Sequence, residues 1–370
     1  MNYELFEENI LNNLSFNNFT DENDTENNEI ILSTPYLSHI LLGVIGILVC
    51  VIGILANLTS IIILNKHAIN KLSTYVYLIA LSVCDAIGLF FTIIVFMQYS
   101  ILPDSAIPSW ILNIYPKVLV YVYPMVIAAQ TLSVWIIFAL TIDRYLCVCR
   151  PNLGIKFCTK RRSSIIVFTL FIVSILYSLP IFFERNYKIV NISNFKVILF
   201  SSLTAFGEST TYFRVYHLYI YTIFICLIPF GTILILNSFL IHSVIKFKRH
   251  RSDFKLLNSE RLLLNNNLTN NEQEISLAQE QEEQKRRLPI NHSDITILLI
   301  GLVVVFIICQ LPSTILRLVT YKNREIIFNP IYVILMDVSN FLVVLNSTIN
   351  CVLYSYTCTQ IYPIYAVGLQ

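Results

Sequence analysis

The stretch Leu140-Thr-Ile-Asp-Arg-Tyr-Leu-Cys-Val-Cys-Arg-Pro151 places an acid next to a base where a long apolar run ends. That run extends from Ile114 to Val148. A helix needs about 20 mostly apolar residues to cross about 30 Å of hydrocarbon at about 1.5 Å per residue. The run is therefore long enough to span a membrane. Asp143 and Arg144 stand where the helix would reach its polar boundary, and an Arg at such a boundary can extend its charged end toward water.

The composition of the whole chain also points to a membrane protein. Of its 370 residues, 56% are hydrophobic and only 13% are charged, and the mean hydropathy is +0.67. Soluble domains carry about 25% charged residues, so this chain lacks the polar surface that water requires. The formal net charge is only +2, which gives no field to attract nucleic acid. We therefore predict membrane lipid as a partner and no nucleic acid.

Six further runs have the length and character of the first, so we predict an all-α membrane protein, a seven-transmembrane helix bundle. The predicted spans are Tyr36–Leu64, Leu72–Gln98, Ile114–Val148, Ser163–Phe183, Val215–Ile245, Ile295–Val319 and Pro330–Tyr356. The predicted domains are an extracellular glycosylated tail (residues 1–35), a transmembrane domain (36–356) and a short cytoplasmic tail (357–370). A long polar loop, about 246–294, joins the fifth and sixth spans.

The distribution of charge predicts how the bundle is oriented. Residues 1–35 contain eight acids and no Lys or Arg, whereas the connections after the first, third and fifth spans are basic. Because cytoplasmic loops are enriched in Lys and Arg, we predict that the N-terminus lies outside the cell and the C-terminus inside. Glycosylation sequons at Asn13, Asn18 and Asn23 agree, since glycans are added on the lumenal side.

Polar residues within the predicted spans are candidates for a functional role, because inserting a charged side chain at the centre of a membrane costs about 2.5–3.5 kcal/mol. Asp85 lies in the middle of the second span, and Ser133, Asn346 and Asn350 lie near the middle of theirs. Their oxygens could hold a small hydrated cation, or they could only join the helices by hydrogen bonds. For Asp85 we favour a functional role.

The end of the third predicted span resembles the signature that ends the third helix of rhodopsin-like (class A) G-protein-coupled receptors. The matching residues are Asp143-Arg-Tyr145, Val148 and Pro151. Five other helices supply matching residues: Asn57, Leu81 to Asp85, Pro229, Phe306 with Cys309-Gln-Leu-Pro312, and Asn346-Ser347 with Asn350 and Tyr354. Within that class, the phrases Leu179-Pro-Ile-Phe-Phe-Glu184 and Leu227-Ile-Pro-Phe230 resemble FMRFamide-type neuropeptide receptors of invertebrates.

The resemblance implies a multi-pass receptor of the plasma membrane that transmits the binding of an extracellular peptide to a heterotrimeric G protein. It implies a coupling and activation switch formed by Asp143, Arg144, Tyr145, Asn237 and Tyr354. It also implies an allosteric sodium ion, and no other cofactor, at Asp85, Ser133, Asn346 and Asn350.

The expected ligand is an amidated peptide that ends in Arg-Phe. Val126 stands where a receptor for monoamines needs a carboxylate, so a monoamine ligand is not expected. A peptide of this kind needs aromatic walls for its ring and an acid for its guanidinium. The predicted ligand-binding residues are Tyr121, Gln130, Glu208, Gln310, Arg317 and Asp337. The acids at this end are Glu184, Glu208, Glu325 and Asp337, with Asp337 and Glu208 as the first candidates; the alternative for each acid is a solvated loop charge or a helix cap.

The chain departs from the family pattern at four places. Leu119 stands where the family has a disulfide cysteine, and the loop after the fourth span contains no Cys. Gln310 and Leu170 replace tryptophans, and Cys351 replaces a helix-seven proline, which should straighten that helix. Only 16 residues follow Tyr354, which indicates reduced regulation by the tail or a truncated product.

Two alternatives to a signalling receptor follow from these departures and from the polar residues at membrane depth. One is a non-signalling or truncated receptor isoform. The other is an ion channel or transporter that uses Asp85 in its pathway, although the chain shows no paired broken helices in two halves. Enzymatic activity is not expected, because no His-Glu-x-x-His sequence or phosphate-binding glycine loop is present.

Overall fold

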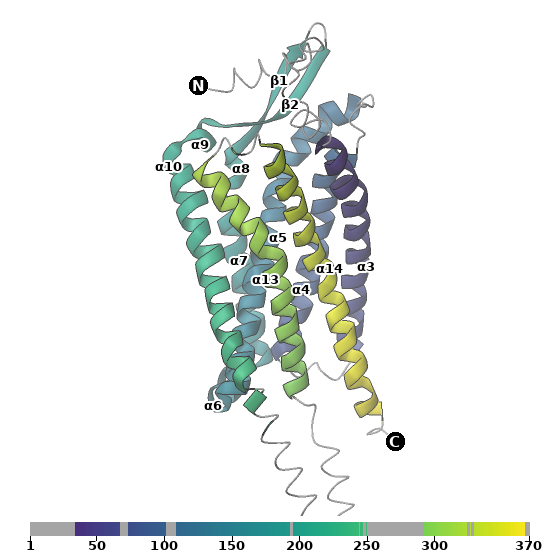
Figure 1. Cartoon of the computed structure of the whole chain (residues 1–370), viewed down its shortest axis with the longest axis vertical. Helices are drawn as coiled ribbons and strands as arrows, with labels where there is room; N and C mark the ends of the chain where they lie inside the picture. Colours follow the sequence, from purple (N-terminus) through teal and green to yellow (C-terminus); the bar gives the residue numbers. More distant parts are fainter. Residues whose placement is uncertain are drawn as a thin grey trace, which may run out of the picture.

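The computed structural model shows seven helices that are long and apolar enough to cross a membrane, arranged as an elongated bundle (Figure 1). It describes residues 34–66, 73–100, 109–192, 195–243, 245, 246, 249, 292–323, 326 and 329–366. The seven helices are Thr34–Asn65, Ser73–Ser100, Ile114–Cys149, Lys160–Glu184, Thr210–Ser243, Ile300–Thr320 and Pro330–Asn350. Each overlaps one predicted span, so the predicted seven-helix bundle is confirmed.

The first four helices are built from a series of shorter elements. Those elements are η1 (His39–Gly46), α3 (Ile47–Lys66), α4 (Ser73–Phe96), η3 (Met97–Ser100), α5 (Ser109–Cys149), α6 (Pro151–Phe157), α7 (Lys160–Ser178) and α8 (Ile181–Glu184). Pro151 occupies the first turn of α6, where its missing N–H leaves no helical bond unmade. Two prolines, Pro116 and Pro124, lie inside α5.

The second half of the chain contains a hairpin and the last three helices. Its elements are β1 (Arg185–Ile192), β2 (Phe195–Leu203), α9 (Ala205–Glu208), α10 (Thr210–Tyr212), η4 (Phe213–Ile220), η5 (Thr222–Leu227), α13 (His292–Lys322) and α14 (Pro330–Ala366). α14 passes Cys351 without interruption, as expected where no proline removes a backbone donor. It ends ten residues beyond the predicted end at Tyr356.

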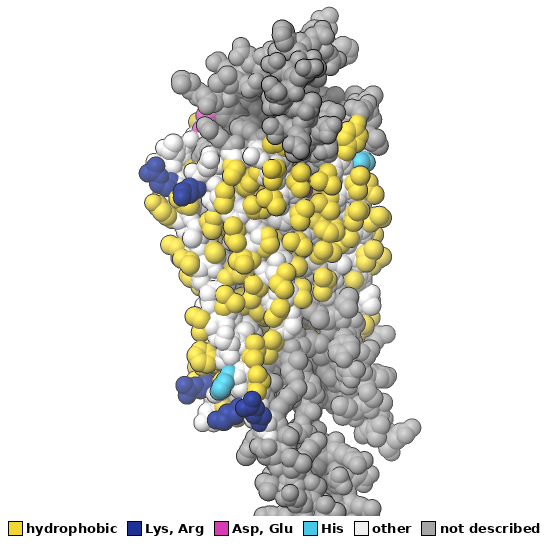
Figure 2. Space-filling view, viewed as in Figure 1, with side chains coloured by type: hydrophobic (Ala, Val, Ile, Leu, Met, Phe, Trp, Pro, Cys, Tyr) yellow, Lys and Arg dark blue, Asp and Glu magenta, His cyan; other side chains and the backbone are white. Residues whose placement is uncertain are grey.

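The outward-facing surface of the bundle is apolar. Leu48, Phe168 and Leu227 are 58%, 66% and 62% exposed, and many similar side chains surround them. On the face drawn in Figure 2, apolar side chains cover the middle of the described part of the molecule, with Lys and Arg side chains near its two ends. Exposed apolar area costs about 25 cal/mol per Å² in water, so this surface suits lipid. The chain is a multi-pass membrane protein.

The largest buried cluster lies between α4, α5, the fifth helix and α13. Ile136, Leu302 and Phe306 are fully buried there, and the rings of Phe230 and Phe306 stack with centroids 5.3 Å apart. Dense packing at this level joins the helices firmly. The cavity described below lies beyond this cluster, toward the hairpin.

The hairpin of β1 and β2 is a difference from the predicted all-α architecture. Its antiparallel register runs from Arg185 opposite Leu203 to Ile192 opposite Phe195. Figure 1 shows the hairpin across the end of the bundle where the first helix begins. We call this the outer end and the opposite end the inner end, following the predicted orientation. Both strands contact α5.

No disulfide attaches the hairpin within the described part of the chain. Each cysteine whose side chain is described is free: Cys50, Cys84, Cys147, Cys149, Cys158, Cys226 and Cys309. Leu119, at the position of the family's cysteine, is 7% exposed. Other contacts must therefore position the hairpin over the bundle.

Candidate functional site

A cavity of about 550 Å³ opens at the outer end of the bundle. Its walls come from α4, η3, α5, α7, α8, β1, η4, η5, α13 and α14. This volume lies within the range of about 300–1,000 Å³ that is usual for ligand pockets. The π-helical segments η4 and η5 supply Tyr216, His217 and Ile225 to the wall. Such segments shift the facing of a helix and occur frequently at functional sites.

Four of the six predicted ligand residues line this cavity. They are Gln130, Gln310, Arg317 and Asp337. Nη2 of Arg317 donates a hydrogen bond to Oε1 of Gln130 over 3.3 Å, which joins α13 to α5. The other two, Tyr121 and Glu208, do not line it. The Tyr121 side chain is 61% exposed on the outer surface of α5, and Glu208 is exposed in α9.

Asp337 is a buried carboxylate in the wall of the cavity. It is 6% exposed, and its Oδ2 accepts a hydrogen bond from Oγ of Ser38 over 2.5 Å. Ser38 belongs to the first helix, so this bond joins the first and seventh helices. Among the described residues, no Lys, Arg or His forms an ion pair with Asp337. A desolvated carboxylate in a polar cavity favours a cationic partner.

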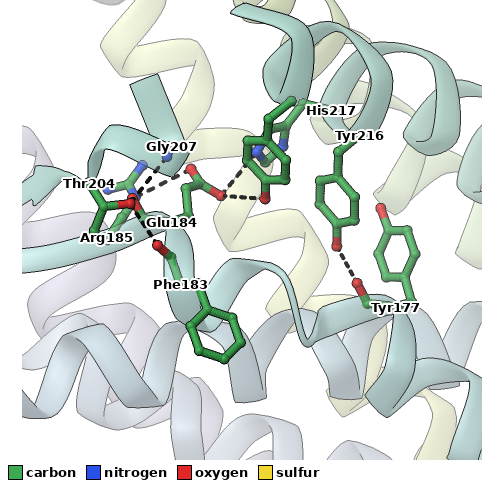
Figure 3. Close-up of polar contacts among 9 residues, drawn as sticks. Tyr177, Phe183, Glu184, Arg185, Thr204, Gly207, Tyr216 and His217 are labelled. Atoms are coloured by element: carbon green, nitrogen blue, oxygen red, sulfur yellow. Dashed lines mark hydrogen bonds and ion pairs between the residues drawn. The ribbon is translucent and has the colours of Figure 1, made fainter. Parts of the chain in front are cut away.

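Glu184 is the second acid of the cavity, and it already has partners (Figure 3). Its Oε2 lies 3.0 Å from Nε2 of His217 and accepts a hydrogen bond from the hydroxyl of Tyr212 over 3.5 Å. Nε of Arg185 lies 3.8 Å from Oε1. Glu184 was among the acids predicted to be available at this end, although Asp337 and Glu208 were the first candidates. Its contacts with His217 and Tyr212 were not predicted. The available signal was an acid placed directly after the predicted span that ends at Phe183.

Aromatic rings line the side of the cavity next to Glu184. The rings of Tyr177 and Tyr216 stack with centroids 5.4 Å apart, and those of Tyr212 and Tyr216 at 5.3 Å. The hydroxyl of Tyr216 donates a hydrogen bond to the backbone oxygen of Tyr177, as Figure 3 shows. Stacked rings of this kind offer an apolar wall to an aromatic group.

The base of the hairpin is attached by hydrogen bonds around Thr204. The backbone N–H of Thr204 donates to the oxygen of Glu184 over 2.9 Å, and its Oγ1 donates to the oxygen of Phe183 over 2.7 Å. The same Oγ1 accepts from the N–H of Gly207 and thereby caps α9. Figure 3 shows these contacts beside Glu184.

Two cation–π contacts connect the hairpin to α5. The guanidinium carbon of Arg185 lies 5.6 Å from the ring centroid of Tyr123, and Nζ of Lys117 lies 5.5 Å from that of Tyr187. Each contact of this type stabilises by about 0.5–1 kcal/mol at an exposed site. Together with the Thr204 bonds they hold the hairpin without a covalent link.

The four residues predicted to hold sodium lie around Asp85, where the second, third and seventh helices meet. Oδ1 of Asp85 accepts hydrogen bonds of 3.2 Å from both Ser133 and Ser347, and Oδ2 accepts one of 2.8 Å from Asn350. Both side-chain polar atoms of Asn346, and Oδ1 of Asn350, are buried without a protein partner. A carboxylate beside unsatisfied amide oxygens is a donor set that fits a small hard cation.

The predicted activation-switch residues whose side chains are described lie at the inner end, where Asp143 and Arg144 form an ion pair. Nη2 of Arg144 lies 2.5 Å from Oδ2 of Asp143, and the two side chains are 4% and 5% exposed. Oγ of Ser73 donates to the same oxygen over 2.8 Å and accepts from Nη2 of Arg144 over 3.3 Å. Arg144 and Asn237 line one small inner void. The ring of Tyr145 packs on the fifth helix, 6.2 Å from that of Phe239.

Several predicted residues lie outside the described residues. The backbone of Tyr354 is in α14, but its side chain is not described. Asn13, Asn18 and Asn23 lie in the tail outside the description, as does most of the loop of about 246–294. Their roles stay predictions.

Comparison with known proteins agrees with the seven-helix architecture. A family model described as "7 transmembrane receptor (rhodopsin family)" matches residues 56–354. The FMRFamide receptor of Drosophila melanogaster is 28% identical over 331 residues, which cover 89% of this chain and 52% of that protein.

Two proteins of Caenorhabditis elegans are also similar. An FMRFamide peptide receptor is 26% identical over 206 residues, covering 55% of this chain and 46% of its own length. A probable G-protein coupled receptor is 23% identical over 351 residues, covering 89% of this chain and 79% of its own length. The chain thus spans about half the length of the two relatives named as FMRFamide receptors.

Proposed function

Because the chain belongs to the rhodopsin family of seven-transmembrane receptors, we propose that it binds an extracellular amidated neuropeptide and activates a heterotrimeric G protein. The proposed location is the plasma membrane, with the outer end facing the extracellular space. Two relatives whose names include FMRFamide receptor support a ligand of that class. The cavity at the outer end would receive the C-terminal Arg-Phe-amide of the peptide.

The observation that carries this proposal is the buried carboxylate of Asp337. It lines the cavity, it is 6% exposed, and its described partner is the neutral hydroxyl of Ser38. A ligand guanidinium would supply the missing positive charge. The stacked rings of Tyr177 and Tyr216 would receive the phenylalanine side chain. Glu184 is a weaker candidate, because His217 and Arg185 already surround its carboxylate.

The test compares two charges in a double-mutant cycle. Membranes that contain the wild-type chain or Asp337→Asn are titrated with an Arg-Phe-amide peptide and with its citrulline analogue, a neutral isostere of Arg. A hydrogen bond to a charged group contributes about 1.5–3 kcal/mol, so each single change should weaken binding about 10- to 150-fold. If the two groups contact each other, the double change should cost little more than either alone.

Glu208→Gln is the matched control, because Glu208 is an exposed acid at the same end that does not line the cavity. It should bind both peptides as the wild type does. Additive losses in the cycle would remove Asp337 from the ligand site. Absence of saturable binding by any amidated peptide, in correctly folded protein, would contradict the peptide proposal itself.

Two further elements complete the proposed mechanism. A sodium ion held by Asp85, with oxygens of Ser133, Asn346 and Asn350, would connect the second, third and seventh helices and favour the inactive form. The Asp143–Arg144 pair would favour the same form from the inner end. A ligand that binds the open form more tightly shifts this equilibrium and frees Arg144 for the G protein.

A further inference from the structure

A second cluster of ligand-type side chains lies at the inner end, beside the activation switch. A carboxylate oxygen of Asp143 and the sulfurs of Cys147 and Cys158 all lie within 4.8 Å of one another. Asp143 is buried, and the two cysteines are partly exposed. Asp143 and Cys147 are four residues apart on α5, so they share one face of the helix.

Cys158 reaches this face because α6 folds back against the end of α5. A Cβ added to Gly154 of α6 would lie 3.0 Å from Cα of Cys147, so a glycine is what permits this close approach. The N–H of Cys158 then donates to the oxygen of Gly154 over 2.8 Å and ends α6. The Cys158 sulfur lies 3.5 Å from the backbone oxygen of Asp143. The local fold therefore holds Cys158, which follows α6, beside the two residues of α5.

We propose that Asp143, Cys147 and Cys158 form a binding site for a single divalent metal ion of the zinc class. Thiolate and carboxylate ligands favour Zn²⁺, and protein thiols on the cytoplasmic side are kept reduced. Tetrahedral coordination with Zn–S bonds of about 2.3 Å places ligand atoms about 3.8 Å apart. The three ligand atoms now lie within 4.8 Å of one another, so metal binding requires them to approach by about 1 Å. The Cys158 sulfur can make this movement because Cys158 lies between α6 and α7. The thiol protons pass to solvent, and water completes the coordination.

Arg144 competes with the metal ion for this site. Its Nη2 lies 2.5 Å from Oδ2 of Asp143 and donates toward the sulfur of Cys147 over 3.6 Å. A guanidinium and a metal ion held at the same carboxylate repel each other, so Arg144 weakens metal binding as long as it is paired with Asp143. Metal binding is therefore linked to release of Arg144 from Asp143, and by reciprocity release of Arg144 strengthens metal binding.

The test uses the full-length chain purified in lipid nanodiscs and titrated with Cd²⁺ alone, whose thiolate complexes absorb in the ultraviolet. One tight site with this absorption is expected. Cys147→Ser and Cys158→Ser should each lower the affinity for Cd²⁺ at least about 100-fold. Loss of a residue that only supports a metal ligand typically lowers metal affinity about 10- to 100-fold, so loss of a ligand itself should cost at least as much. Arg144→Gln should bind Cd²⁺ about tenfold more tightly, since one charged hydrogen bond no longer competes.

Cys149→Ser is the matched control, because the Cys149 sulfur lies on the same helix but contacts Oγ of Ser243 at 3.2 Å. It should bind Cd²⁺ as the wild type does. Tight binding that survives in both Cys147→Ser and Cys158→Ser would overturn the site, and unchanged affinity in Arg144→Gln would overturn the competition. Thermal unfolding of each variant verifies that it is folded. Metal binding needs neither peptide nor G protein, so its outcome is independent of the proposed function.

Discussion

Replacing Asp143 by Asn should activate the receptor without ligand. The change removes the negative charge that holds Arg144, whose side chain is 4% exposed. Breaking a buried ion pair by neutralising one partner costs about 3–5 kcal/mol. That cost falls on the closed form, because in the open form Arg144 has left Asp143. The substitution therefore acts directly on the equilibrium between the two forms.

If the substitution destabilises the closed form by about 3 kcal/mol relative to the open form, the ratio of open to closed forms increases about 150-fold. A receptor with about 1% open form would then reach roughly 60%. Ser73→Ala offers a graded comparison, because Oγ of Ser73 bonds both Asp143 and Arg144. Its loss should cost the closed form about 1 kcal/mol and raise the ratio only about fivefold.

The assay is ligand-independent guanine nucleotide exchange in membranes, normalised to receptor number at the cell surface. The predicted order of basal rates is Asp143→Asn, then Ser73→Ala, then the wild type. A basal rate of Asp143→Asn equal to that of the wild type, at equal surface number, would refute the assignment of this pair as a closing contact.

Three other predictions concern the rest of the bundle. Gly43→Ala should lower the unfolding temperature, because its Cβ would lie 2.2 Å from the backbone oxygen of Tyr99, whereas Gly231→Ala meets no atom within 4 Å and should not. Thermal unfolding in detergent compares the two, and equal temperatures would argue against the packing of the first two helices. Asp85→Asn should abolish any effect of sodium on peptide affinity, measured by binding with and without the ion, and a retained effect would exclude Asp85 as its ligand. Thr204→Val removes the hydroxyl that donates a hydrogen bond to the base of the hairpin, at a cost of about 1 kcal/mol. Amide hydrogen exchange in the hairpin (residues 185–203) should therefore become faster. An unchanged exchange rate would show that other contacts hold the hairpin.

The seven helices were predictable because lipid leaves the backbone few choices. A spanning segment must satisfy its own N–H and C=O groups, so a run such as Ile114–Val148 can only be a helix there. The helix Ile114–Cys149 ends one residue from the predicted position. The predicted end of the seventh helix was less accurate, because α14 continues beyond Tyr356 to Ala366 through a segment that mixes polar and apolar residues.

The cavity wall was predicted only in part, because apolar runs do not reveal how a helix is rotated. Tyr121 and Tyr123 both lie in the outer half of α5, but two residues correspond to about 200° of helix rotation. Tyr123 therefore lines the cavity while Tyr121 faces outward. The π-helical turns of η4 and η5 change the facing of the fifth helix further, and no residue type marks them.

The hairpin of β1 and β2 was not part of the architecture predicted for the loop after the fourth span. Its sequence carried a signal, since two stretches rich in Val, Ile and Phe are separated by the two residues Ser193 and Asn194. The Glu184–His217 contact was harder to predict from the sequence. It joins residues 33 positions apart and depends on the folding of the hairpin base between them.

The proposed coupling of peptide binding to a G protein is tested most directly by peptide-stimulated guanine nucleotide exchange. Membranes from cells that express the chain with a heterotrimeric G protein are exposed to amidated peptides ending in Arg-Phe and to the same peptides with a free C-terminal acid. Saturable stimulation by the amidated peptides is expected, with weaker or no stimulation by the acids. Saturable binding of the amidated peptides without any increase in nucleotide exchange would contradict the proposed coupling.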